Sequence, residues 1–186
     1  MRPTFIREYT TEDLYETLLN EVPWVRVKET PRRECFMAVD LRLKYSYGNS
    51  NSDRTRVYTA VEMHPAVRAL MDRLNAEFGC AYNVCVLNAY ADERDHLGWH
   101  ADDSPEQDLT HPIAVIAFGA EREIWVKVKS AKGEVPKEDR YLMTRGGLFI
   151  MPPGFQEVMA HRIPKCDHKC GGRISLTFRK LDRNPD

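Results

Sequence analysis

The sequence contains no long apolar run. No segment approaches the roughly 20 consecutive apolar residues that a helix needs to cross a bilayer. The first residues, Met1 to Glu8, lack the apolar core of a secretory signal peptide. Internal repeats, low-complexity tracts and linkers are missing from the sequence as well. We therefore expect an intracellular protein, cytoplasmic or nuclear, that has no membrane partner.

Neither sign of charge dominates the chain. Lysine and arginine number 27, aspartate and glutamate 28, and the net charge is −1. This balance argues against a protein that binds polyanions over its whole surface, although it permits a local basic strip. With 186 residues, of which 42% are hydrophobic, the chain is long enough for one well-buried domain and too short for two ordinary ones. We expect a single domain over residues 1–186 and a monomer.

The sequence has few cysteines, and their number is odd. The five cysteines stand at positions 35, 80, 85, 166 and 170. An odd count, with three of them in or beside apolar stretches, favours a reduced intracellular protein over a disulfide scaffold. The stretch Cys166-Asp-His168-Lys-Cys170 offers three ligands to a metal such as zinc but no fourth. We expect a solvated loop there, and a second metal stays an open alternative.

Two segments have the periodicity of a helix. The first is short and amphipathic, with Thr11 as its cap and its apolar positions at Leu14, Leu18, Leu19 and Val22. The second covers residues 65–78. It opens on a proline, it is closed by Gly79, and its apolar positions are Val67, Leu70, Met71, Leu74 and Phe78.

After Gly79 the sequence is typical of β-structure. Short segments rich in β-branched and aromatic residues alternate with clusters of Gly, Pro, Asp and Ser. The predicted strands are residues 82–90, 112–118, 123–129, 139–143, 147–151, 158–163 and 172–180. Helices followed by strands predict an α+β, mainly β fold, namely a β-sandwich or jelly-roll with the helices packed outside.

The segment from residue 30 to residue 60 is polar, irregular and rich in arginine and tyrosine. We interpret it as paired strands with a flexible tip at residues 48–53. Between Pro23 and Tyr58 there are eight Lys or Arg against four Asp or Glu, with aromatic residues interspersed. Cations contact phosphates and aromatic faces stack on bases, so this mixture favours single-stranded or flipped-out nucleic acid. The alternative is a solvated hairpin whose tyrosines pack on the barrel.

Two histidines and one carboxylate are candidates for a metal site. Residues i and i+2 of a strand or tight turn project to the same side, so His100-x-Asp102 directs two ligands at one point. His161, in a late predicted strand, supplies a third. This set suits mononuclear non-haem Fe(II), which keeps open positions for a co-substrate and O₂. An isolated His-x-Asp also occurs by chance, and the competing histidines are His64, His96, His111 and His168.

Two predicted strands carry polar residues that suit a dicarboxylate. Arg173, Ser175, Thr177 and Arg179 share one face of the last strand. If that face lines the interior, its guanidinium groups can bind a co-substrate such as 2-oxoglutarate through paired hydrogen bonds. Asn88 and Tyr90 share a face at the end of an earlier strand, just before the metal motif. The alternatives are an edge strand with solvent-facing arginines and an ordinary polar strand end.

These motifs follow one another in the order found in a known family. They are Asn88-x-Tyr90, residues 95–103, Pro112-Ile-Ala with Phe118-Gly-Ala, His161, and Arg173-x-Ser-Leu-Thr-Phe-Arg179. Over residues 30–181 the chain resembles the AlkB family of Fe(II)/2-oxoglutarate-dependent dioxygenases, in its nucleic-acid dealkylase branch.

The resemblance implies a fold and a set of residue roles. The fold is a double-stranded β-helix, or jelly-roll, with its core at about residues 80–181 and a nucleotide-recognition lid at about residues 24–60. The implied iron ligands are His100, Asp102 and His161. The positions implied around 2-oxoglutarate are Asn88, Tyr90, Arg173, Ser175 and Arg179. Pro31-Arg32 and Tyr58-Thr59 resemble lid positions that contact a flipped nucleotide, and we add Tyr47 and Asp103 as candidate base contacts.

The sequence therefore predicts an oxidative demethylase of DNA or RNA that uses Fe(II), O₂ and 2-oxoglutarate and releases formaldehyde. Its expected substrates are N-alkylated bases of the 1-methyladenine or 3-methylcytosine type. Ser104 stands where relatives often carry an acidic residue, which leaves the base preference open. One alternative is the same oxygenase acting on a protein or another non-nucleic-acid substrate. A second is a non-catalytic reader of modified nucleic acid, against which the intact ligand triad argues.

Overall fold

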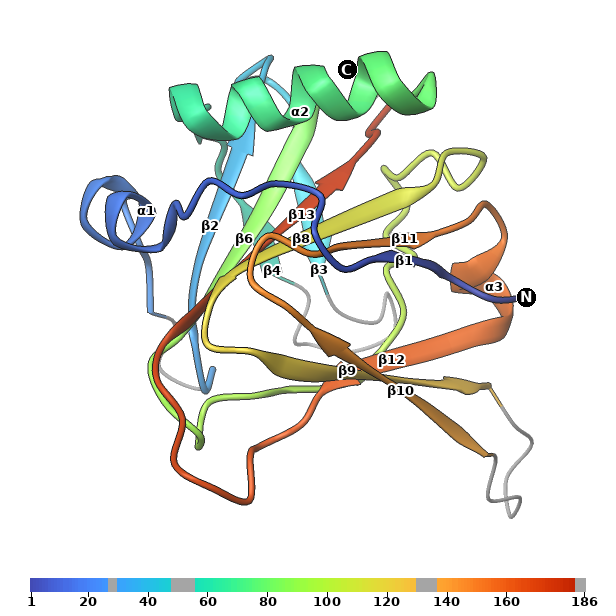
Figure 1. The fold of residues 1–186 in the computed structure, drawn as a ribbon. Coiled ribbons are helices and arrows are strands. Elements are labelled where there is room, and N and C mark those ends of the chain that lie inside the picture. The colour runs from blue at the N-terminus through green and yellow to red at the C-terminus, as the bar shows by residue number, and fades with distance from the viewer. Residues whose placement is uncertain (27–29, 48–55, 130–136, 183–186) are drawn as a thin grey trace.

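Two β-sheets lie face to face in the computed structural model, which describes residues 1–26, 30–47, 56–129 and 137–182 (Figure 1). The major sheet has seven strands in the order β1-β11-β8-β13-β6-β2-β5, and the minor sheet has four in the order β10-β9-β12-β7. Strands β3 and β4 form a separate two-stranded sheet. The predicted jelly-roll is confirmed.

The elements have the following bounds. The major sheet contains β1 (Thr4–Ile6), β11 (Leu148–Met151), β8 (Ile113–Gly119), β13 (Arg173–Arg179), β6 (Val84–Tyr90), β2 (Arg33–Ala38) and β5 (Val61–Glu62). The minor sheet contains β10 (Glu138–Met143), β9 (Arg122–Val128), β12 (Met159–Ile163) and β7 (Leu97–His100). The small sheet pairs β3 (Tyr45–Tyr47) with β4 (Arg56–Tyr58), and the helices are α1 (Tyr15–Glu21), α2 (Pro65–Phe78) and α3 (Phe155–Val158).

All seven strands predicted after Gly79 are present, with ends within two residues of the expected ones. Four elements were not predicted: β1, β5, β7 and the single-turn helix α3. Each is too short to show a period of its own in the sequence. Strand β2, inside the segment expected as a lid, pairs with β6 and is part of the major sheet. The expected tip at residues 48–53 lies outside the described residues.

Helix α2 agrees with its prediction. His64 caps it by accepting a hydrogen bond from the Ala66 N–H at Nδ1 (3.2 Å), and Pro65 occupies the first turn. Gly79 ends the helix in the left-handed conformation at φ 62°, which glycine adopts without steric cost. His64 is therefore a helix-start residue, as expected.

Helix α1 begins later than its prediction, which was wrong about the Thr11 cap. The helix starts at Tyr15, and Leu14 at the cap position makes no side-chain cap hydrogen bond. The preceding backbone is held elsewhere, because the N–H groups of Tyr9 and Thr10 both donate to the Gly146 carbonyl (3.1 and 3.2 Å). These contacts hold residues 9 and 10 outside the helix, and the Tyr15 N–H donates to Asp13 Oδ1 (3.2 Å) where the helix begins.

Two apolar clusters hold the layers together. Alternate residues of β6, β8 and β13 face α1 and α2, which cover the outer face of the major sheet (Figure 1). The opposite set packs between the two sheets with residues of β9, β11 and β12. Because β13 contributes Ile174, Leu176 and Phe178 to the outer cluster, its Arg173, Ser175 and Arg179 face the interior. Among the described residues, no helix has the length and apolarity to span a membrane.

Candidate metal centre and co-substrate pocket

Sheet pairing brings the predicted metal ligands together. In the register of β7 and β12, His100 lies directly opposite His161. Asp102 follows β7 by two residues, where the chain leaves the sheet and turns its carboxylate back toward both imidazoles. The pairing of β7 with β12 therefore brings together two histidines that are far apart in the sequence.

The three side chains converge on one point. His100 Nε2 lies 3.6 Å from Asp102 Oδ1, and His161 Nε2 lies 3.6 Å from Asp102 Oδ2. One ligand atom from each residue falls within 4.8 Å of the others, and in the described part of the chain this is the only cluster of three or more such ligands. Asp102 and His161 are buried. Two imidazole nitrogens and one carboxylate fit a non-haem iron ion.

The electrostatics of the triad suit a cation. Burial lowers the pKa of His100, and burial together with His100 lowers the pKa of His161 to about 3. Burial opposes ionisation of Asp102, but Arg179 and the two histidines outweigh it and lower the pKa of that carboxyl. At neutral pH both imidazoles are neutral and Asp102 is ionised. These are the protonation states that metal binding requires.

Neighbouring groups orient the ligands. His100 Nδ1 lies 2.8 Å from the Gly98 carbonyl, which places the proton on Nδ1 and leaves Nε2 free to bind a metal. The backbone N–H of Asp102 donates to Gln156 Oε1 at 2.8 Å. Gln156 is buried in α3, so it fixes the turn that presents the carboxylate.

Replacing Gln156 with leucine is expected to weaken metal binding by about 10- to 100-fold, because a hydrogen-bond partner that orients a ligand is lost. A titration with Mn(II) followed by calorimetry measures the change. Gln107→Leu is the matched control, since Gln107 is buried and its side-chain oxygen has no hydrogen-bond partner among the described residues. Equal Mn(II) affinity in wild type and Gln156→Leu contradicts the orienting role.

The residues predicted around the co-substrate meet on two adjacent strands. Arg173 lies opposite Tyr90, and Ser175 lies opposite Asn88, in the register of β13 and β6. All four are buried. Arg173 has no accessible surface, and its three guanidinium nitrogens form no well-aligned hydrogen bond within the described residues. An isolated buried cation is costly, so this arrangement fits a bound anion that supplies the missing acceptors.

A second buried arginine, Arg122, differs from Arg173 because both of its Nη atoms have hydrogen-bond acceptors. Arg122 lies on the same aromatic ring as Arg173, with Tyr90 at 5.2 and 5.4 Å from the two guanidinium carbons respectively. Arg122 donates to the carbonyls of Asp92, Asp95 and Pro164. Burial lowers the pKa of Arg173 to about 10. The Arg122 guanidinium therefore binds acceptors within the protein, whereas the Arg173 guanidinium has no well-aligned acceptor among the described residues.

Arg179 occupies the metal end of the same strand face. Its Nη2 lies 2.8 Å from Asp102 Oδ1, and its Nη1 donates to the Tyr45 hydroxyl. Burial opposes its charge, but Asp102 and Tyr45 outweigh that effect and raise its pKa. Arg179 therefore contacts Asp102, a predicted iron ligand, whereas Arg173 lies opposite Tyr90, so the two arginines mark opposite ends of a polar strip.

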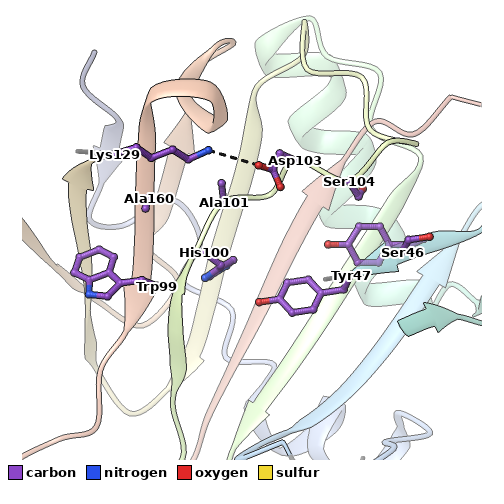
Figure 2. Close-up of a pocket in the computed structure, with 10 residues that line it drawn as sticks. Ser46, Tyr47, Trp99, His100, Ala101, Asp103, Ser104, Lys129 and Ala160 are labelled. Carbon is purple, nitrogen blue, oxygen red and sulfur yellow. Dashed lines mark ion pairs between the residues drawn. The ribbon is translucent and has the colours of Figure 1, made fainter. Parts of the chain in front are cut away.

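A cavity of about 370 Å³ is lined by His100 of the triad together with residues of β3, β7 and the segment after β7. Figure 2 shows His100 in it between Trp99 and Tyr47, with Asp103 and Lys129 paired across the rim at 3.5 Å. The Tyr47 and His100 rings are 6.1 Å apart. The cavity is in the size range of small-molecule sites, and it is separate from the buried Arg173.

Of the four predicted base contacts, the structure brings two to this cavity. Tyr47 and Asp103 line it. Arg32 and Tyr58 contact Glu34 instead, at 2.5 and 2.7 Å, so their contact with a base stays a prediction.

The competing histidines lie away from the triad. His96 Nδ1 is 3.1 Å from the Arg94 carbonyl, and His111 pairs with Asp108 at 2.8 Å. His168 is 74% exposed and pairs with Asp167. The thiols of Cys166 and Cys170 are 3.4 Å apart, but His168 does not join them in a ligand cluster within the described residues.

Three residues of this region were not predicted. Gln156, Tyr45 and Arg122 act through hydrogen bonds to groups far away in the sequence, and no spacing pattern predicts such contacts. Tyr45 stood among the aromatics noted between residues 23 and 58, but nothing in the sequence placed it on Arg179.

Comparisons with known proteins agree with the site. A family model for the 2OG-Fe(II) oxygenase superfamily matches residues 1–179. Human alpha-ketoglutarate-dependent dioxygenase alkB homolog 3 is 30% identical over 190 aligned residues, which cover 98% of this chain and 66% of that protein. The chain thus spans just under two thirds of that relative.

The chain is also similar to a second curated relative and to a solved structure. Bovine DNA oxidative demethylase ALKBH2 is 31% identical over 121 residues, 63% of this chain and 44% of that protein. The solved structure of OsALKBH1 matches with a TM-score of 0.63 at 14% identity, over 97% of this chain and 99% of that one, which shows the shared fold.

Proposed function

Because the chain belongs to the 2OG-Fe(II) oxygenase superfamily and, within it, to the AlkB family, we propose that it removes N-alkyl groups oxidatively from DNA or RNA bases. The bases are of the 1-methyladenine or 3-methylcytosine type. One observation carries the proposal: the strand face that bears Arg179 at the triad also bears, at its other end, the buried Arg173 without a well-aligned acceptor, while His100 of the triad lines an open cavity. Co-substrate and substrate thus have separate binding places beside the triad.

In this proposal His100, Asp102 and His161 hold Fe(II). Arg173 binds the distal carboxylate of 2-oxoglutarate, with Tyr90, Asn88 and Ser175 along the strip and Arg179 at the metal end. When bound, Fe(II) with O₂ and 2-oxoglutarate supplies the oxidant that hydroxylates the N-alkyl group, with succinate and CO₂ as the other products. The hydroxymethyl adduct of a methylated base then decomposes to formaldehyde and the repaired base. No side-chain general base is needed.

The outer cavity is the proposed base site. Tyr47 offers an aromatic face beside His100 for stacking, worth about 1–3 kcal/mol for a base on an aromatic ring. Asp103 offers a carboxylate to an exocyclic amine. The Asp103 side chain is 56% exposed and forms an ion pair with Lys129, whose side chain is 38% exposed. Because such a surface ion pair is weak, a base that binds Asp103 can replace it at little cost.

Formaldehyde release from methylated oligonucleotides tests the function. We expect release from single-stranded DNA or RNA carrying 1-methyladenine or 3-methylcytosine, with one succinate formed per formaldehyde. Oligonucleotide affinity should fall as salt rises, since phosphate contacts release counterions. Succinate formation without formaldehyde from any DNA or RNA in the panel, together with weak and salt-insensitive binding, favours the alternative of a protein or other non-nucleic-acid substrate.

The remaining organisation is proposed on the same basis. Residues 1–186 form one catalytic domain, in which residues 24–60 supply substrate recognition and residues 80–181 the catalytic core. We expect a monomer in the cytoplasm or nucleus. The packing of both sheets and the helices into contiguous apolar clusters supports the single domain.

A further inference from the structure

A buried carboxylate lies beneath the hairpin formed by β3 and β4. Glu34 in β2 is 2% exposed. It is paired with Arg32 Nη2 at 2.5 Å and Arg56 Nη1 at 2.9 Å, and it accepts a hydrogen bond from the Tyr58 hydroxyl at 2.7 Å. None of these residues contacts the metal triad in the described structure. A carboxylate buried with two cations is stable only while its partners stay in place.

Two of the three partners belong to the hairpin. Arg56 and Tyr58 both lie in β4, and β4 pairs with β3 so that Tyr45 is opposite Tyr58 and Tyr47 is opposite Arg56. The Arg56 guanidinium also lies 5.6 Å from the Tyr47 ring and 5.4 Å from the Tyr58 ring. Glu34 therefore reaches Tyr47, the aromatic face of the outer cavity, through one guanidinium group.

The third partner ties Glu34 to the major sheet. Arg32 Nε donates to Asn88 Oδ1 at 2.7 Å, and Asn88 lies opposite Ser175 in the centre of that sheet. Glu34 thus connects the hairpin, through Arg56 and Tyr58, to the major sheet, through Arg32. The hairpin has further attachments among the described residues: Ser46 Oγ donates to Glu106 at 2.6 Å, the Tyr45 hydroxyl accepts a hydrogen bond from Arg179, and Tyr45 and Tyr58 pack on Phe36.

We propose that Glu34 is a positioning residue for substrate recognition: by holding Arg56 and Tyr58 it sets the β3–β4 hairpin, and with it Tyr47, over the cavity beside His100. Its effect is on the binding of the base and not on the chemical step. The identity of the substrate rests on the proposed function, but the positioning of the hairpin does not.

Amide hydrogen exchange on the metal-free protein tests the positioning directly. In Tyr58→Phe the ring stays and one hydrogen bond to a charged group is lost, so exchange at residues 45–47 and 56–58 should be roughly tenfold to hundredfold faster. Glu34→Gln removes the charge as well and should have a larger effect at the same residues. The β6 and β13 amides should be unchanged in Tyr58→Phe. Unchanged exchange in the hairpin of both variants overturns the proposal.

Kinetics separate positioning from a general loss of structure. With an active oligonucleotide, we expect the KM for that oligonucleotide to rise about tenfold in Tyr58→Phe while kcat and the KM for 2-oxoglutarate stay near wild type, the pattern of lost uniform binding. Glu138→Gln is the control, because Glu138 also lies between two arginines, Arg140 and Arg162 at 3.9 and 3.8 Å, but outside both sites. A lower kcat together with a higher KM for 2-oxoglutarate, or the same change in Glu138→Gln, overturns the proposal. If no oligonucleotide is turned over, the exchange experiment still decides about Glu34.

Discussion

Replacing His161 with alanine is expected to abolish the stabilisation that a divalent metal gives this protein. Wild type at a Mn(II) concentration about 100 times the Kd should gain about 2.7 kcal/mol. For a chain of this size that is a rise in Tm of roughly 5–10 °C. His161 supplies one of three ligands that meet within 4.8 Å, and two ligands alone hold the ion weakly. Thermal unfolding with and without Mn(II) measures the effect.

A second histidine provides the control for this experiment. His111 also has a carboxylate partner, Asp108 at 2.8 Å, but it lies outside the triad. His111→Ala should keep the full metal-induced rise in Tm. A full rise in His161→Ala places the ion elsewhere and removes the basis for the oxygenase chemistry. The formaldehyde assay should follow the metal result, with no product from His161→Ala.

The parts of the fold that sequence predicts are those with a local period. Helix α2 is fixed by its proline, its apolar spacing and Gly79, all within one short segment. The alternation in β13 is equally local, and it correctly separated Arg173, Ser175 and Arg179 from the apolar face. The segment before α1 is held instead by the distant carbonyl of Gly146. No local pattern records that contact.

The same distinction applies to the site. The order of motifs in the sequence was enough to propose His100, Asp102 and His161, and the pairing of β7 with β12 accounts for their proximity. Whether Arg173 or Arg179 has a hydrogen-bond acceptor in the protein depends on the residues that surround it in three dimensions, which the sequence does not show. Arg179 reaches Asp102 and Tyr45, whereas Arg173 lies beside Tyr90 and has no well-aligned acceptor among the described residues. From sequence the two arginines looked equivalent.

Replacing Arg173 with methionine is expected to separate stability from co-substrate binding. Methionine fills much of the same volume and removes a buried charge that lacks a partner, so the unfolding free energy without co-substrate should stay level or rise. The affinity for 2-oxoglutarate should fall by about 2–5 kcal/mol, the cost of losing one member of a buried charge pair. That is roughly a thirtyfold to several thousandfold increase in Kd. Calorimetry on the Mn(II)-loaded protein measures it, beside denaturant unfolding.

Arg122→Met is the matched variant, and it should show the opposite pattern. Arg122 is as buried as Arg173 and lies on the same Tyr90 ring, but it donates to three backbone carbonyls. Its loss leaves those carbonyls without a donor and should destabilise the protein by about 3 kcal/mol or more. Its effect on 2-oxoglutarate affinity should be much smaller than that of Arg173→Met. If Arg173→Met destabilises the protein while leaving 2-oxoglutarate affinity intact, Arg173 is a structural residue and the dicarboxylate binds elsewhere.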